Sequence, residues 1–253
     1  MILNPDQLSA REKQILVGMF LSKFDEKGVA ALGFDSFIEA FNALGYGLGG
    51  RPASIKNYRD EFDPLFPNKR KGWHKRPRRD YCVKLAANYQ SLSLKNFARL
   101  VASFIGAPDQ IIPSQPAEDD NLSPSSFAKR LITGRAAEQY FQAVYSRLPE
   151  FGQCDVEDTT MQGCGYDFRL WPKSGDKFRA VEVKGIADRS GWLSLTEKEH
   201  DSAAALGDRF YLFVVKNFRE KPFHEMHANP LAGPLSFARK ERQIVQVSWL
   251  AAA

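Results

Sequence analysis

Two short apolar segments separated by turn residues constrain the fold of this chain more than any other feature. The first, Gly165–Leu170, alternates apolar and polar residues, and the second, Ala180–Gly185, places valines on either side of Glu182. Both patterns are typical of β-strands. The segment between them, residues 171–176, contains Pro, Ser, Gly and Asp, which are the residues of turns. The sequence therefore predicts a β-hairpin.

The predicted hairpin gathers charged side chains on one face. Side chains two residues apart on a strand point the same way, so Glu182 and Lys184 share a face and Val181 and Val183 occupy the other. If Asp167 on the paired strand faces the same side, two carboxylates and one ammonium converge. Carboxylates are hard oxygen ligands for a divalent cation, and such a cation activates water and stabilises charge on a phosphate. A solvated ion pair on a strand edge is the alternative.

These residues resemble the motif of the PD-(D/E)xK nuclease superfamily, with Asp167 as the first acid and Glu182–Lys184 as the (D/E)xK element. Tyr166 stands where the motif has proline, at a position that varies in the superfamily. More narrowly, the chain from Gly134 to about Asn217 resembles the C-terminal domain of the plant NO VEIN protein, which recurs in bacterial defence proteins. The matching blocks are Gly134–Glu138, Gly165–Asp167, Glu182–Gly185, Leu195–Glu199 and Tyr211–Val215.

The resemblance implies a restriction-endonuclease-like α/β core with a mixed central sheet. It implies that Asp167 and Glu182 hold Mg²⁺, for which Mn²⁺ substitutes, and that Lys184 polarises the water that attacks a phosphodiester bond in DNA. An acid on the helix before the sheet often supplies a further ligand in this superfamily, and Glu138 fits that place. A plain surface glutamate is the alternative for Glu138. The implied biological setting is restriction or antiviral defence.

The remainder of this C-terminal region gives weaker signals. Trp192–Leu195 is predicted as a short strand that leads into Thr196, a good N-cap residue. Thr196 and Glu199 have the spacing of a capping box, so we assign Glu199 a structural role ahead of a catalytic one. Phe210–Val215 is strongly apolar and is predicted to be a central strand. The two histidines of His224–His227 lack a third ligand, so a zinc site is not predicted there.

Composition divides the chain into a helical segment, residues 1–106, a linker, residues 107–124, and a nuclease-like domain, residues 125–253. The linker carries four prolines and an acidic patch, Glu118–Asp120, and few large apolar residues. Proline-rich polar stretches behave as semi-rigid spacers. Apolar residues recur at helical spacing on both sides of it, and a long amphipathic helix is predicted from Ser125.

Positive charge concentrates in residues 51–80, which contain ten Lys or Arg residues and four Asp or Glu residues. The net charge of this segment is therefore larger than the net charge of +5 for the whole chain. A turn followed by Ser54 as an N-cap predicts a recognition helix of the helix-turn-helix kind, and residues 69–79 predict a basic loop. We interpret these basic residues as contacts to DNA phosphates. The alternative is that they form a solvated face of the protein. The predicted DNA-binding residues are Arg51, Lys56, Asn57, Arg59, Lys69, Arg70, Lys71, Trp73, Lys75, Arg76, Arg78 and Arg79.

Composition also restricts the class of protein. A chain of 253 residues with 43% hydrophobic and 26% charged residues can bury one large core or two smaller ones. Its apolar runs are shorter than a membrane span requires, and its N-terminus lacks the apolar core of a signal peptide. The three cysteines show no CxxC spacing. We therefore expect free thiols and a cytoplasmic location without membrane association.

Together these patterns predict an α+β two-domain protein, with an N-terminal all-α, helix-turn-helix-like domain and a C-terminal nuclease-like core. The predicted activity is that of a Mg²⁺-dependent endonuclease on double-stranded DNA. A homodimer is expected, since one active site per chain cuts one strand. One alternative is a catalytically inactive nuclease-fold sensor or DNA-binding regulator. Another is a helix-turn-helix regulator with an unrelated ligand domain. The chain has no Walker-type phosphate loop, so ATP-driven translocation would need a separate subunit.

Overall fold

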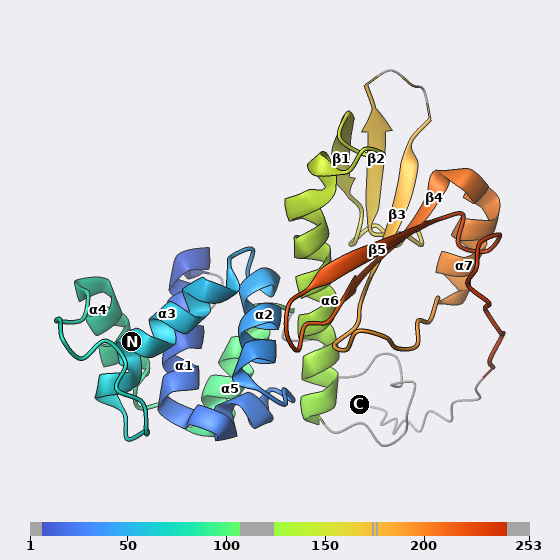
Figure 1. Cartoon of the computed structure of the whole chain (residues 1–253). Helices are drawn as coiled ribbons and strands as arrows, with labels where there is room; N and C mark the ends of the chain where they lie inside the picture. The colour runs from blue at the N-terminus through green and yellow to red at the C-terminus, as the bar shows by residue number, and fades with distance from the viewer. Residues whose placement is uncertain (1–6, 107–123, 174, 176, 242–253) are drawn as a thin grey trace, which may run out of the picture.

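The computed structural model describes residues 7–106, 124–173, 175 and 177–241. Five helices form the N-terminal half, and a five-stranded mixed sheet with two long helices forms the C-terminal half. Figure 1 shows the helical half on one side of α6 and the sheet on the other. No helix in the described ranges is both long and apolar enough to cross a membrane. The α+β composition predicted from the sequence is thus observed.

The N-terminal half is a helical bundle around an aromatic core. Its helices are α1 (Ala10–Ala31), α2 (Phe37–Gly47), α3 (Pro52–Phe62), α4 (Asp80–Tyr89) and α5 (Leu94–Ser103), with a 3-10 turn at Asp63–Leu65. Ser9 caps α1 in a capping box with Glu12, and Ser36 caps α2. Phe20, Phe62 and Phe97 are fully buried in this core. Burial of such rings is the main stabilising contribution of helices this short.

The turn between α2 and α3 contains Gly49 at φ +65, a conformation that favours glycine. The two helices it joins are the ones predicted to form a helix-turn-helix-like unit. The prediction of Ser54 as the N-cap of α3 is wrong. The helix begins three residues earlier than a Ser54 cap implies, at Pro52, because proline is preorganised for the first helical position and Arg51 takes the cap position.

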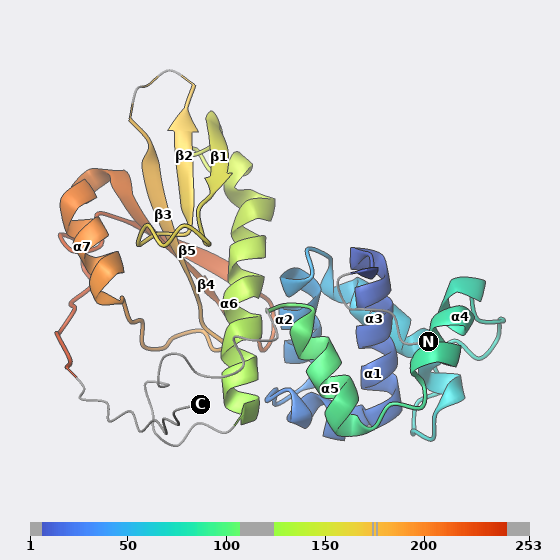
Figure 2. The same ribbon diagram turned by 180° about the vertical axis from the view of Figure 1, so that it is seen from behind.

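Helix α6 (Pro124–Val144) lies between the two halves and belongs to both cores (Figure 2). Ile132 packs with the N-terminal aromatic core, whereas Ala137 and Phe141 pack against the sheet. The predicted helix from Ser125 is therefore confirmed. Residues 107–123 of the predicted linker lie outside the described residues, and the last residue of that prediction, Pro124, opens α6.

The sheet has the strand order β1-β2-β3-β4-β5. Its strands are β1 (Cys154–Asp158), β2 (Phe168–Pro172), β3 (Arg179–Gly185), β4 (Phe210–Lys216) and β5 (Phe223–Ala228). All neighbours are antiparallel except β3 and β4, which are parallel and are joined through α7 (Glu197–Leu206). The predicted hairpin is confirmed as β2–β3, and the predicted central strand is β4. The predicted strand Trp192–Leu195 is wrong, because this segment forms a loop.

The two faces of the sheet are covered by different helices. Val181 and Val183 of β3 and Phe168 of β2 pack against Phe141 of α6. On the opposite face, Ala180 packs with residues of α7 and of the chain that follows it. Because side chains alternate along β3, the face opposite the valines carries Glu182 and Lys184. This alternation places both charged residues on the α7 side, as the sequence predicts.

Candidate active site

The hairpin holds Asp167 over the middle of β3. Asp167 immediately precedes β2, and its backbone N–H donates to the carbonyl oxygen of Val181 at 3.0 Å. Its side-chain Oδ2 accepts a hydrogen bond from the backbone N–H of Val183 at 2.8 Å. These two bonds fix the carboxyl group across β3 from both sides of Glu182. Backbone hydrogen bonds between Asp167 and β3 therefore bring the two acids together, as predicted.

Lys184 lies between two carboxylates. Its Nζ is 2.7 Å from Glu182 Oε1 and 2.6 Å from Glu199 Oε2. Glu199 also forms the predicted capping box with Thr196 at the start of α7, so its structural role is confirmed. The contact with Lys184 was not predicted. The sequence spacing of a capping box reveals only the local bond, whereas the ion pair depends on how α7 packs beside β3.

Two glycines allow helices to approach this hairpin closely. A Cβ on Gly185 would lie 2.8 Å from the carbonyl oxygen of Thr133 on α6. A Cβ on Gly165 would lie 2.4 Å from Ser202 Oγ on α7, and Gly165 has φ +81, a conformation that other residues rarely adopt. The glycines on either side of the charged residues thus bring both helices against the site.

Glu138 comes to the same cleft from α6. The cleft has a volume of about 690 Å³ and is lined by Glu138, Asp167, Glu182 and Lys184 among others. Glu138 Oε2 accepts a hydrogen bond from Arg135 Nη1 at 2.7 Å. Burial raises the pKa of the Glu138 carboxyl above its ordinary value, against the opposing effect of Arg135. The four predicted catalytic residues therefore meet in one cleft.

The cleft also has lining residues that the sequence did not indicate. Lys129 and Arg130 come from α6, and Trp192 comes from the loop between β3 and α7. A lysine and an arginine on a helix and a tryptophan in a loop carry no spacing signal of their own. Only the fold brings them to the acids.

Burial gives the two central acids unusual titration behaviour. Burial, with a smaller contribution from the charge of Glu138, raises the pKa of Asp167 to about 7, although the Val183 N–H opposes the shift. Burial and the charge of Asp167 raise the pKa of Glu182 to about 8, although Lys184 opposes it. For Lys184, burial lowers the pKa, but the two glutamates more than compensate, and the net shift is upward. The lysine stays charged while the acids hold protons near neutrality.

Asp167 and Glu182 are the residues of this cleft that could hold a hard divalent cation. Asp167 and Glu182 offer carboxylate oxygens, and their pKa values show that their negative charges are poorly compensated by the protein. The described part of the chain contains no group of three or more His, Cys, Asp or Glu side chains placed to hold a metal ion. Mg²⁺ commonly uses one or two carboxylates, with water and substrate phosphate completing its coordination. Two acids with a third nearby suit that mode better than a zinc cage.

Comparison with known proteins was made for the whole chain. Residues 137–228 match the family model described as "Protein NO VEIN, C-terminal". The matched NO VEIN-like region begins in α6 and ends with β5, so it includes Glu138, the hairpin and α7. The N-terminal helices lie outside it. No curated protein and no solved structure matches the chain.

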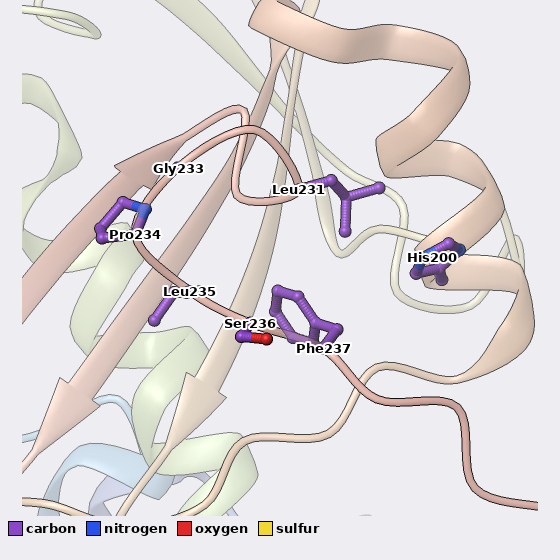
Figure 3. Close-up of a pocket in the computed structure, with 7 residues that line it drawn as sticks. All are labelled: His200, Leu231, Gly233, Pro234, Leu235, Ser236 and Phe237. Carbon is purple, nitrogen blue, oxygen red and sulfur yellow. The ribbon is translucent and has the colours of Figure 1, made fainter.

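A second cavity in the NO VEIN-like region and the chain after it differs in chemistry. It lies between α7 and residues 231–237, has a volume of about 460 Å³, and is shown in Figure 3. Leu231, Leu235 and Phe237 line it, and His200 is its titratable side chain. Among the described residues, its lining contains no Asp or Glu, so it differs from the cleft at Lys184, which contains three carboxyl groups. His224, part of the histidine pair considered above, instead stacks on Phe213 with ring centroids 4.8 Å apart.

The basic segment outside the NO VEIN-like region is partly committed to internal ion pairs. Asp63 is buried and pairs with Arg70 at 2.9 Å, and buried Glu61 pairs with Arg76 at 3.3 Å. Arg79 also pairs with Glu61, and both Arg59 and Lys56 pair with Asp60. The guanidinium groups of Arg76 and Arg79 lie over the ring of Trp73. The exposed predicted DNA-binding cations that have no ion pair in the described ranges are Arg51, Lys69, Lys71 and Lys75. The arginine ion pairs stabilise the conformation of the segment. Arg51, Lys69, Lys71 and Lys75 are exposed to solvent.

Proposed function

We propose that the protein is a metal-dependent endodeoxyribonuclease that hydrolyses phosphodiester bonds with Mg²⁺ or Mn²⁺ and acts in restriction or antiviral defence. The observation that carries the proposal is the cleft in which Asp167, Glu182 and Lys184 meet on the face of β3. A buried Glu182 and a half-buried Asp167, both with raised pKa values, lie beside a charged lysine, an arrangement suited to a cation and a phosphate. The NO VEIN-like match supports a defence setting, and the cytoplasm is the compartment in which we place it.

The residues have distinct roles in this proposal. Asp167 and Glu182 would hold the cation, and Glu138 would assist in placing it. The cation, when bound, neutralises charge on the scissile phosphate and makes bound water more acidic. Lys184 remains an ammonium, so it donates hydrogen bonds that orient the attacking water and stabilise negative charge developing at phosphorus. Glu199 keeps the ammonium in place through the 2.6 Å ion pair.

The helical half would supply affinity for DNA. Arg51, Lys69, Lys71 and Lys75 are exposed cations available for phosphate contact. Such contacts give salt-dependent, sequence-independent binding, whereas sequence preference would come from α3. Because each chain has one such cleft, cutting both strands calls for a homodimer.

The decisive experiment replaces Lys184 with alanine. We expect Lys184→Ala to abolish Mg²⁺-dependent and Mn²⁺-dependent cleavage of plasmid and modified or unmodified linear DNA, because the ammonium that orients water is lost. DNA retention in a gel shift should stay close to that of the wild type. The matched control is Lys177→Ala, which removes an exposed lysine preceding β3, and it should cleave normally. Equal cleavage by the wild type and Lys184→Ala would refute the proposal.

A catalytically inactive nucleic-acid sensor is the second candidate. The observation that favours it is the lack of a three-residue metal-binding group within the described residues. In that case the wild-type protein would retain DNA but would cleave none of these substrates with either metal ion. The same gel-shift and cleavage assays therefore separate the two functions.

A further inference from the structure

Trp192 stands apart from the other described tryptophans. Its side chain is fully exposed, with 101% of its reference area accessible. Trp73 lies under Arg76 with 4.4 Å between guanidinium and ring, and Trp171 donates its indole N–H to Glu157 at 3.1 Å. Trp192 has no such partner within the described residues. An indole with no protein contact beside a cleft is an unoccupied stacking surface.

The loop that carries Trp192 is anchored at both ends. Ile186 donates its N–H to the carbonyl oxygen of Val215 at 2.8 Å, and Asn217 donates to the carbonyl oxygen of Asp188 at 2.8 Å. At the other end, Thr196 caps α7. The backbone on each side of Trp192 is therefore fixed to the sheet and to α7. Trp192 lies between these two anchors and lines the same cleft as the acids.

A cation reaches the same cleft from a different element. Arg130, on α6, lines the cleft with Trp192 and is exposed. It has no ion pair with any described residue, whereas its neighbour Lys129 pairs with Glu39 at 2.9 Å. The cleft thus offers an aromatic face, an uncommitted guanidinium and, deeper, the Lys184 ammonium. This combination complements a planar base joined to a phosphate.

We propose that Trp192 stacks on an unpaired base of the DNA strand whose phosphate enters the cleft, with Arg130 contacting a neighbouring phosphate. This inference rests on the proposed function and names its substrate class, which is DNA with an unpaired nucleotide beside the scissile bond. In an intact duplex both faces of each base are covered by its neighbours. An unpaired nucleotide, in a single strand or at a bulge, frees a face for the indole.

The test measures binding in EDTA, so that it does not depend on cleavage. Labelled DNA is titrated with the full-length protein and followed by fluorescence anisotropy, using a single-stranded oligonucleotide, a duplex with a central bulge and a blunt duplex of equal length. Trp192→Ala should weaken binding of the first two by about 5-fold to 150-fold, the range that loss of one base–aromatic stack gives. Trp192→Phe, which keeps an aromatic face, should retain most of the affinity.

The matched control is Trp171→Ala, which removes a partly exposed tryptophan outside the cleft and should bind all three DNAs like the wild type. Intrinsic fluorescence gives a second readout. The difference in quenching between the wild type and Trp192→Phe should be large with the single strand and small with the blunt duplex. Unchanged affinity of Trp192→Ala for the unpaired DNAs, or equal weakening with the blunt duplex, would overturn the inference. Neither result depends on whether Lys184→Ala abolishes cleavage, so the two proposals fail separately.

Discussion

At the scale of single residues, Glu182 is the side chain with the most unusual environment. It is buried beside a second carboxyl, and its pKa is about 8 in the folded protein, with that of Asp167 at about 7. In the unfolded chain both groups titrate near pH 4. Between these values the folded state binds more protons than the unfolded state. The contribution of these two carboxyls to the stability of the metal-free protein therefore falls as the pH rises from about 4 to about 8.

This linkage predicts a specific pH dependence. In EDTA, the Tm of the wild type should be higher near pH 5.5 than near pH 8.5, and Glu182→Gln should show a smaller decrease because one titrating carboxyl is gone. Mg²⁺ should raise the Tm of the wild type more at the higher pH, since the ligands must be deprotonated to bind it. Thermal melts by circular dichroism measure both effects. The same pH slope in the wild type and Glu182→Gln would show that the carboxyl is not the titrating group.

Residue patterns predicted that Asp167, Glu182 and Lys184 come together, but they did not show the internal ion pairs of the basic segment. Asp167, Glu182 and Lys184 follow from strand alternation and a turn, which are local properties of the sequence. The interpretation of residues 51–80 as a DNA-binding segment rests on their net charge. Net charge does not show that Glu61 and Asp63 are buried and paired with arginines. Counting charges cannot separate cations that face solvent from those that organise the fold. Their contact with DNA stays a prediction.

At the scale of elements, α7 connects helix capping with the positioning of Lys184. Glu199 Oε2 accepts from the Thr196 N–H at 3.1 Å and from Lys184 Nζ at 2.6 Å. One carboxylate oxygen thus serves both the helix terminus and the site. Substitutions at Glu199 and at Thr196 separate these roles, because a glutamine at the third helical position still supports a capping box.

We predict that Glu199→Gln keeps the stability of α7 but lowers kcat for DNA cleavage by about 10-fold to 100-fold, as loss of a supporting contact commonly does. Thr196→Ala should instead lower the free energy of unfolding by about 1 kcal/mol and leave kcat unchanged, since it removes the cap and keeps the ion pair. Urea unfolding and steady-state cleavage assays measure the two quantities. Identical profiles for the two variants would contradict a separate effect on Lys184.

Elements differed in how well the sequence predicted them. β3 and β4 are buried and rich in valine, so local pattern was sufficient. β1 (Cys154–Asp158) was not predicted, because it is an edge strand with mostly exposed polar residues and exists through its pairing with β2. Trp192–Leu195 looks like a strand but has no neighbouring strand to pair with. Pairing partners distant in sequence decide such cases.

At the scale of the whole molecule, the two halves are joined by buried polar contacts as well as by α6. Asn42 of α2 is buried and donates from Nδ2 to the carbonyl oxygens of Phe218 at 2.7 Å and Glu220 at 3.0 Å. Arg219 in the same loop pairs with Asp35 at 2.7 Å. These bonds couple the helical half to the turn between β4 and β5.

We predict that Asn42→Ala lowers the free energy of unfolding by about 1–3 kcal/mol, because it leaves the carbonyl group of buried Phe218 without this donor. Asn57→Ala, which alters an exposed asparagine of α3, should have no measurable effect. Urea unfolding followed by both far-UV circular dichroism and tryptophan fluorescence measures the change. Equal stability of the two variants would mean that the Asn42 bonds do not hold the halves together.

Because β3 and β4 are parallel, a crossover connection must join the end of β3 to the start of β4. Residues 186–196 and α7 form this connection. Asp167, Glu182 and Glu138 all lie elsewhere. Residues 189–195 are therefore free to lengthen, shorten or exchange side chains over evolutionary time while the hairpin and its chemistry stay intact. A lineage built on this plan can acquire new targets by remodelling a single connection.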